Sequence, residues 1–171
     1  MSSTIIVQGG GPTPPSAAEQ SHAAARAYRV LRWVGILLAS VTLVDVVLVF
    51  VPMQWERTDW VLATLVQSIG GLPVLAVGLG ALTASVVGLR ESGPARAVAV
   101  VHVLLVLAIV ALVLTFTPVA MAATRAAPEG LASDVGRAVV RTFAYSLIFI
   151  ALHAMLAGIC WRAGRPAGPV A

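Results

Sequence analysis

Residues 60–90 read WVLATLVQSIGGLPVLAVGLGALTASVVGLR, and this segment decides the fold class. It carries no charged side chain before Arg90. A helix rises about 1.5 Å per residue, so about 20 apolar residues cross a hydrocarbon core about 30 Å thick. The segment is therefore predicted to span a membrane, and its length predicts a tilt or a kink. Gly70-Gly71 and Pro73 lie near its middle, and proline removes a backbone donor, so we place the kink there.

The rest of the chain has the same apolar character. The apolar fraction is 59% and the charged fraction 11%, against about 25% charged residues in a soluble domain. We expect an all-α, integral membrane four-helix bundle. Its membrane helices are predicted at about residues 32–52, 61–87, 97–118 and 139–161, within a domain that covers residues 32–161.

The flanking segments differ in composition. Residues 1–15 are rich in glycine and proline and predict a disordered tail. Residues 16–31 predict a cytoplasmic amphipathic helix that leads into the first membrane helix. Ser16 and Glu19 have the spacing of a capping box at its start. Residues 162–171 form a short C-terminal tail.

The eleven arginines predict the orientation. Seven fall on one side of the predicted membrane: Arg26, Arg29, Arg32, Arg90, Arg96, Arg162 and Arg165. Four fall on the other: Arg57, Arg125, Arg137 and Arg141. Cytoplasmic ends of membrane helices carry an excess of basic residues, so both termini are predicted in the cytoplasm.

Small residues recur every fourth position along the second membrane helix. Ala76, Gly80, Ala84 and Gly88 predict a helix-packing interface, because close backbone approach holds helices together in lipid. The pattern leaves open whether this stripe packs within the chain or against another chain.

Polar residues cluster in the outer half of the predicted membrane: Asp45, Gln67, Thr115, Thr117, Arg141 and Tyr145. An ionisable side chain at the centre of a membrane helix costs about 2.5–3.5 kcal/mol on insertion scales, so it needs a partner or a purpose. We predict an intramembrane clasp in which Asp45 pairs with Arg141 or accepts a hydrogen bond from Gln67. A proton or ion pathway through Asp45 is the alternative.

Two histidines lie in the inner half, His102 and His153, at similar depth on antiparallel helices. A b-type haem needs two such axial imidazoles, so haem b is one option. Hydrogen bonding between helices by neutral imidazoles, with Thr83 or Ser85 as partners, is favoured instead. No metal or cofactor is therefore favoured. The single cysteine, Cys160, excludes a disulfide within the chain and is expected to be a small buried filler.

The sequence lacks the patterns of soluble enzymes. It contains no glycine-rich phosphate loop, no paired-carboxylate site and no Ser/His/Asp set in its polar loops. It also lacks a basic stripe with interleaved aromatic residues, so nucleic acid is not an expected partner. We expect no enzymatic activity.

Four short segments in the first half of the chain form a recognisable set: Leu31-Arg32-Trp33, Leu43-Val44-Asp45, Val51-Pro52-Met53-Gln54 and Leu72-Pro73-Val74. With these segments, residues 31–89 resemble the HpsJ-like membrane proteins associated with hormogonium polysaccharide in cyanobacteria. The resemblance implies an accessory role at the cell envelope, and it implies no catalytic residue.

These observations together favour a non-catalytic accessory or scaffold subunit of a larger bacterial membrane complex. It would be a multi-pass protein of the cytoplasmic (inner) membrane, with lipids and other integral membrane subunits as partners. The arginine-only, alanine-rich composition suggests a high-GC bacterial source. Two alternatives remain. One is a haem-bearing or quinone-linked electron-transfer subunit that uses His102 and His153, and the other is a small transporter or channel that uses Asp45.

Overall fold

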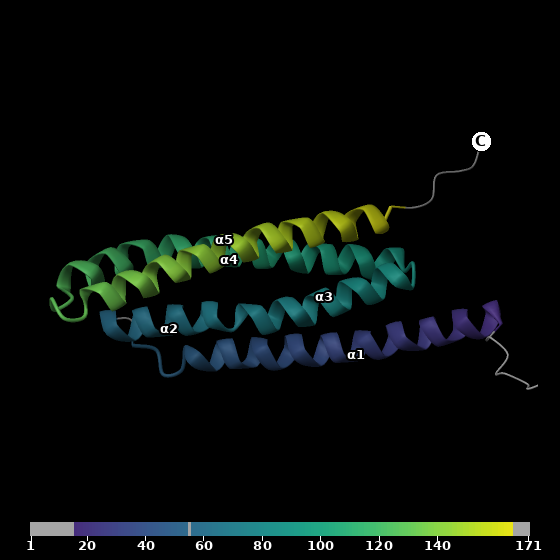
Figure 1. Cartoon of the computed structure of the whole chain (residues 1–171), viewed down its shortest axis with the longest axis horizontal. Helices are drawn as coiled ribbons and strands as arrows, with labels where there is room; N and C mark the ends of the chain where they lie inside the picture. The colour runs from purple at the N-terminus through teal and green to yellow at the C-terminus, as the bar shows by residue number, and fades with distance from the viewer. Residues whose placement is uncertain (1–15, 55, 166–171) are drawn as a thin grey trace, which may run out of the picture.

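The computed structural model describes residues 16–54 and 56–165, and these residues form helices and short connections without a strand. The predicted tail at residues 1–15 and positions 166–171 lie outside the described residues. The helices are α1 (Ala17–Val49), α2 (Thr58–Gly70), α3 (Leu72–Gly88), α4 (Ser92–Ala126) and α5 (Ala132–Ala163) (Figure 1).

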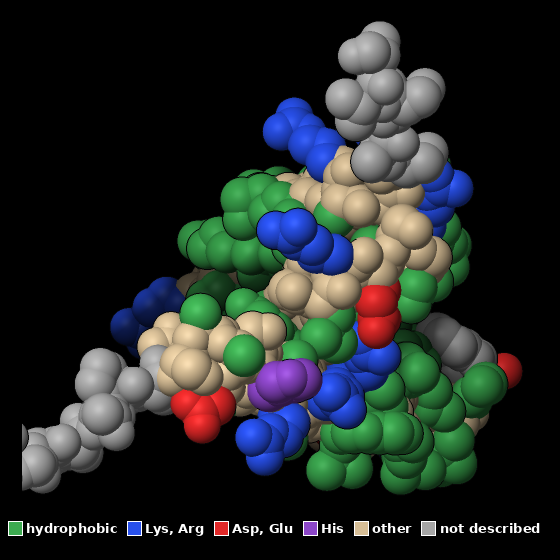
Figure 2. All heavy atoms as spheres, turned by 90° about the vertical axis from the view of Figure 1, so that its right-hand side faces the viewer, with side chains coloured by type: hydrophobic (Ala, Val, Ile, Leu, Met, Phe, Trp, Pro, Cys, Tyr) green, Lys and Arg blue, Asp and Glu red, His purple; other side chains and the backbone are tan. Residues whose placement is uncertain are grey.

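Four helical segments are long and apolar enough to cross a membrane, because α2 and α3 act as one segment over Asp59–Gly88. The predicted all-α membrane bundle of four helices is therefore confirmed. α1 begins and α5 ends at the same end of the bundle, and arginine side chains gather on that end (Figure 2). Which side of a membrane this end faces stays a prediction.

α1 is continuous from the predicted cytoplasmic helix into the first membrane helix. Its first turn has the predicted capping box. The hydroxyl oxygen of Ser16 accepts from the backbone N–H of Glu19 at 3.3 Å, and the Glu19 carboxylate accepts from the backbone N–H of Ser16 at 2.7 Å. These bonds satisfy two backbone donors that a helix start would otherwise leave unpaired.

The second membrane segment is interrupted at the predicted place. α2 ends at Gly70, α3 begins at Leu72, and Pro73 lies in the first turn of α3. The backbone keeps its helical course across the break: Gly71 N–H donates to the Gln67 carbonyl at 3.2 Å, and Leu75 N–H donates to the Gly71 carbonyl at 3.3 Å.

The predicted end of the third membrane helix near Pro118 is wrong, because α4 continues to Ala126 with Pro118 inside it. Membrane helices tolerate proline where hydroxyl side chains and neighbouring helices satisfy nearby backbone groups. The hydroxyl groups of Thr115 and Thr117 donate to the carbonyls of Ala111 and Val113 at 2.9 and 2.8 Å, and neither of these is the Leu114 carbonyl that loses its donor at Pro118. α5 begins at Ala132, before the membrane span predicted at about residues 139–161, so only a short connection joins α4 and α5.

The helices form layers around the α2–α3 segment (Figure 1). Half of the most apolar window of this segment is buried, against 11% of the corresponding window of α1. Among the described residues, α1 contacts α2 and α3 but neither α4 nor α5. α4 and α5 pack on each other and on the opposite side of the α2–α3 segment. α1 is therefore a peripheral helix held by α3.

Two glycines allow the backbones of α1 and α3 to approach closely. A Cβ added to Gly78 would lie 2.9 Å from the backbone nitrogen of Ala39 and 3.1 Å from the carbonyl oxygen of Gly35. A Cβ added to Gly35 would lie 2.7 Å from the carbonyl oxygen of Gly78. Neither position has room for a side chain, so these glycines set the distance between the two helices.

The predicted stripe does not face one neighbouring helix. Ala76 is buried in the core, a Cβ at Gly80 would meet nothing within 4 Å, Ala84 is exposed, and Gly88 lies against the Tyr28 ring. Four residues advance about 400° around a helix, so such a stripe drifts by about 40° at each step. The stripe therefore does not form one packing face within this chain, and contacts of its exposed members with another chain stay a prediction.

Replacing Gly78 by alanine should destabilise the fold. The added methyl group meets backbone atoms, and overpacking of this kind costs about 1–3 kcal/mol. Unfolding of the purified protein in mixed detergent micelles, followed by circular dichroism, measures the difference.

Gly80→Ala is the matched control, since the same group enters open space. It should be neutral or stabilising by roughly 0.5–1 kcal/mol, because alanine favours a helix more than glycine does. Equal destabilisation by both variants would contradict the assigned role of Gly78.

Candidate functional site

A buried polar cluster lies between α4 and α5, where His102 and His153 meet. Their Nδ1 atoms are 2.9 Å apart, and both side chains are 0% exposed. The ring centroids lie 5.1 Å apart. The two histidines at matching depth on antiparallel helices thus come together, as the sequence predicts.

The cluster extends to α3 through Thr83. The Thr83 hydroxyl oxygen is 2.9 Å from Nε2 of His102, and the Cys160 thiol of α5 lies 3.6 Å from the same oxygen. The predicted hydrogen bond to Thr83 is confirmed for the imidazole of His102, while His153, among the described residues, bonds only to His102. Cys160 is buried as expected, but it also contributes a thiol hydrogen bond to the network.

The chemistry of the side chains limits the direction of these hydrogen bonds. A neutral imidazole has one N–H, so one ring must donate in the Nδ1–Nδ1 contact and the other must accept. If His102 donates, its Nε2 accepts from the Thr83 hydroxyl, which in turn accepts from the Cys160 thiol. In this order each of the three bonds has one donor. It leaves the N–H of His153 at Nε2, which is buried without a hydrogen-bond partner among the described residues.

The present arrangement does not fit axial ligation of a haem iron. Metal–imidazole bonds are about 2 Å long, so an iron between two imidazoles would separate the coordinating nitrogens by about 4 Å. The Nδ1 atoms of His102 and His153 are instead bonded to each other at 2.9 Å. Within the described residues, no group of three or more His, Cys, Asp or Glu side chains could hold a metal ion. Haem b at these histidines stays a prediction that requires the rings to separate.

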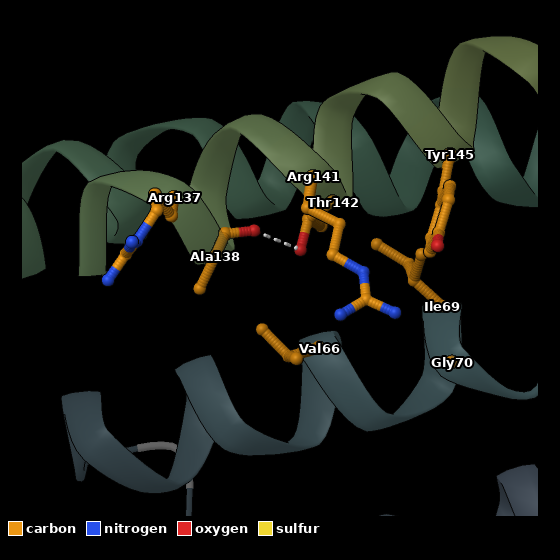
Figure 3. A pocket seen from close by; sticks show the side chains of 8 residues that line it. All are labelled: Val66, Ile69, Gly70, Arg137, Ala138, Arg141, Thr142 and Tyr145. Carbon is orange, nitrogen blue, oxygen red and sulfur yellow. Dashed lines mark hydrogen bonds between the residues drawn. The ribbon is translucent and has the colours of Figure 1, made fainter. Parts of the chain in front are cut away.

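Arg141 and Tyr145 form the second polar feature. The guanidinium carbon of Arg141 lies 5.1 Å from the centroid of the Tyr145 ring, which is within the range of cation–π attraction. Both side chains project from α5 toward α2, where Val66 and Gly70 line the same groove (Figure 3). This groove is open to the outside of the bundle, and Arg141 is exposed within it.

The predicted clasp between the first and fourth membrane helices does not form within the chain. Asp45 and Gln67 are both exposed, and among the described residues no hydrogen bond or ion pair joins Asp45 to Gln67 or Arg141. The reason is the arrangement of the helices. α1 contacts α2 but not α5, so α2 separates the carboxylate from the guanidinium.

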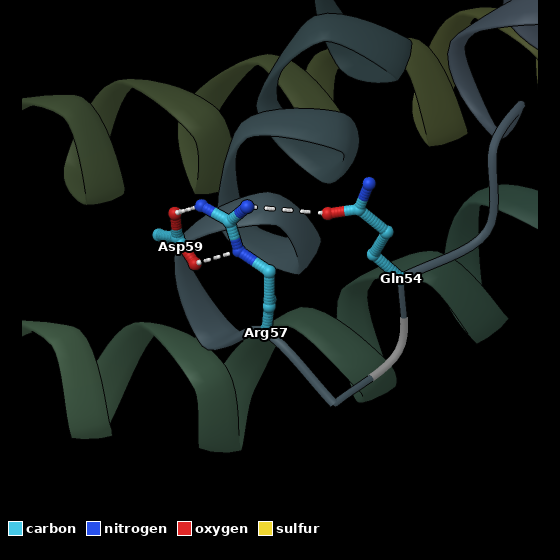
Figure 4. A network of polar contacts seen from close by, with 3 residues as sticks. All are labelled: Gln54, Arg57 and Asp59. Atoms are coloured by element: carbon cyan, nitrogen blue, oxygen red, sulfur yellow. Dashed lines mark hydrogen bonds and ion pairs between the residues drawn. The ribbon is translucent and has the colours of Figure 1, made fainter.

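Ion pairs lie near the helix ends. Arg57 pairs with Asp59 at 2.6 Å and also contacts Gln54 in the segment between α1 and α2 (Figure 4). The neighbouring Asp59 carboxylate raises the pKa of Arg57 by hydrogen bonding and by charge attraction. Arg57 therefore stays charged at this exposed turn.

Sequence analysis missed a link between α1 and the turn after α3. Arg32 pairs with Glu91 at 2.5 Å, and its Nε donates to the Ser85 hydroxyl at 3.4 Å. Ser85 is thus occupied by Arg32 rather than by an imidazole. The pair was predictable from the sequence, because Arg32 and Glu91 lie at the same predicted membrane boundary.

Comparisons with family models, with curated proteins and with solved structures found no match to this chain. The resemblance of residues 31–89 to HpsJ-like proteins therefore stays a prediction. Functional inference must rest on the chain's own geometry.

Replacing Thr83 by valine should destabilise the bundle by about 1–3 kcal/mol. Valine keeps the shape but removes the hydroxyl, which leaves Nε2 of His102 buried without its partner. Unfolding in mixed micelles measures the loss.

Thr83→Ser is the matched control, because it retains the hydroxyl and removes only a methyl group. It should lie closer to the wild-type protein than Thr83→Val does. A valine variant as stable as the wild type would show that the hydroxyl contributes nothing to the cluster.

Proposed function

We propose that this chain is a non-catalytic accessory or scaffold subunit of a larger assembly in the bacterial cytoplasmic membrane, with both termini in the cytoplasm. One observation supports it most directly. Asp45 and Arg141 lie in membrane-spanning helices, yet each is exposed and neither is paired with an opposite charge among the described residues.

Exposure of this kind is costly in lipid. A charged side chain that faces hydrocarbon loses its hydration, so intramembrane charges normally face other protein or a water-filled cavity. Four buried hydroxyl groups are likewise paired with polar groups of the protein. Thr42, Ser68, Thr142 and Ser146 each donate to a backbone carbonyl of the preceding turn at 2.8 Å. The contrast supports the view that the exposed charges meet protein outside this chain.

The position of α1 supports the same proposal. Among the described residues α1 packs on α2 and α3, its Arg32 side chain reaches Glu91 in the turn after α3, and most of its surface is left uncovered within the chain. A helix with one covered side can present its remaining surface to another membrane protein. Association of membrane helices depends on such close contacts and on hydrogen bonds between helices.

Quinone-linked electron transfer is the second candidate, and a single observation favours it. Nε2 of His153 is buried without a hydrogen-bond partner among the described residues. A quinone carbonyl could accept from an N–H at this atom. Transport through Asp45 has no comparable support, because Asp45 faces outward from α1 rather than into the bundle.

Gentle extraction from native membranes tests the first proposal. The protein should leave a sizing column in a complex larger than its own mass of 17.6 kDa plus detergent, and native mass spectrometry should identify the other components. Ala84→Leu should weaken that complex while insertion and helix content stay unchanged, because Ala84 is an exposed member of the small-residue stripe predicted to contact another chain.

Ala151→Leu is the control for added bulk at an exposed position of α5. It should leave the complex intact. A wild-type protein that is monomeric in every mild detergent and in nanodiscs would argue against the scaffold proposal. Co-purifying quinone that is lost in His153→Leu would instead support the second candidate.

A further inference from the structure

Asp45 and Arg141 lie at the same level of the bundle. A Cβ on Gly71 would lie 3.5 Å from Val46 and 3.6 Å from Thr42, so Asp45 stands beside the α2–α3 break. Gly70, which precedes the break, lines the groove that holds Arg141 and Tyr145. The carboxylate and the guanidinium are therefore at similar depth, on opposite sides of α2.

Both groups also lie on one surface of the molecule. Ala39, Ser40 and Leu43 line a groove with residues of α3 and α4, so that flank of α1 faces the α4 side. Asp45 follows Leu43 by two residues, which is about 200° around a helix, so it lies on the flank away from α4.

Arg141 lies in the groove between α5 and α2, and α4, which packs on both of these helices, lies behind the groove (Figure 3). α1, α2 and α5 thus form a row with α2 in the middle, as Figure 1 also shows. We call this surface the Asp45–Arg141 face. It consists of Asp45 on α1, Val66 and Gly70 on α2, and Arg141 and Tyr145 on α5.

This arrangement of charges is self-complementary. Two copies that face each other in a membrane with the same orientation are related by a two-fold axis along the membrane normal. This rotation leaves the depth of every group in the membrane unchanged. With the two α2 helices at the axis, α1 of each copy lies opposite α5 of the other. The Asp45 carboxylate of each copy therefore meets the Arg141 guanidinium of the other. Such an interface uses the same patch on both subunits.

We propose that the protein forms a two-fold symmetric homodimer through the Asp45–Arg141 face, in which Asp45 of each copy pairs with Arg141 of the other. The inference rests on the proposed scaffold function and names its first partner as a second copy of this chain. The polar pair predicted from the sequence is thereby formed between chains rather than within one.

The middle of the face suits close contact between two α2 helices. Gly70 is exposed, and a Cβ there would meet nothing within 4 Å, so the backbones can approach across the axis. Tyr145 holds the guanidinium of Arg141 at the groove by cation–π attraction. The two ion pairs would then remove both exposed charges from lipid.

Charge reversal provides the decisive experiment. Asp45→Arg places two bases on the face and Arg141→Asp places two acids on it, so neither variant can pair with itself. Each should raise the dimer dissociation constant about 30-fold or more, because both symmetric pairs are lost. Co-expressed with different affinity tags, the two variants should form a heterodimer, since each charge then meets its opposite.

Cysteine cross-linking locates the axis. In a Cys160→Ala background, Gly70→Cys should form a disulfide-linked dimer in native membranes under mild oxidation, because this position meets its own copy. Val66→Cys on the same face is the second variant. Leu43→Cys, on the opposite flank of α1, is the matched control and should stay monomeric.

The outcomes separate this inference from the scaffold proposal. Heterodimer rescue together with cross-linking at position 70 or 66 supports the homodimer. A second outcome is a folded protein that shows neither cross-linking nor heterodimer formation, while Asp45→Arg abolishes co-purification of a different membrane protein. This outcome overturns the homodimer and supports the scaffold role. A monomer without any partner overturns both. If the double variant Asp45→Arg/Arg141→Asp behaves like the wild type but the two single variants form no heterodimer, the two residues pair within one chain. That result also overturns the homodimer.

Discussion

The approach of α1 to α3 at Gly35 and Gly78 determines how the other parts are placed. The two backbones meet where neither helix has a side chain, and this contact holds α1 against the centre of the bundle. With α1 on that side, α2 stands between it and α5. The positions of Asp45 and Arg141 on one surface follow from this contact.

Polar groups of the membrane region fall into two kinds. Those inside the bundle, apart from Nε2 of His153, are matched within the chain, by a carbonyl of the preceding turn or by the cluster of His102, His153, Thr83 and Cys160. Asp45 and Arg141, on the outside, have no partner of opposite charge among the described residues. A bilayer supplies few hydrogen-bonding groups in its interior, so the unmatched kind carries the information about contacts beyond the chain.

Sequence reasoning located features that depend on position along a helix. The four spans, the capping box at Ser16, the break at Gly71 and the meeting of His102 with His153 all follow from depth, spacing or local backbone chemistry. It did not predict which neighbouring helix a side chain faces. Asp45 and Arg141 share a depth but not a contact, and the four-residue stripe drifts around α3, because a sequence does not state which helix lies beside which face.

Pro118 illustrates another limit of the sequence. A proline ends most helices in water, where freed backbone groups can turn to solvent. Within α4, an apolar helix packed on α5, the helix continues through Pro118 to Ala126. The surroundings, rather than the residue alone, decide whether the helix stops.

The unbroken course of α1 has a mechanical meaning. Its 33 residues extend about 50 Å, so about 20 Å of the helix projects beyond a hydrocarbon core about 30 Å thick. A continuous helix transmits rotation and tilt along its length, since every turn is bonded to the next. The capped start at Ser16 and the segment around Asp45 therefore belong to one uninterrupted helix, so the direction of the projecting part is fixed by the contacts of α1 within the bundle.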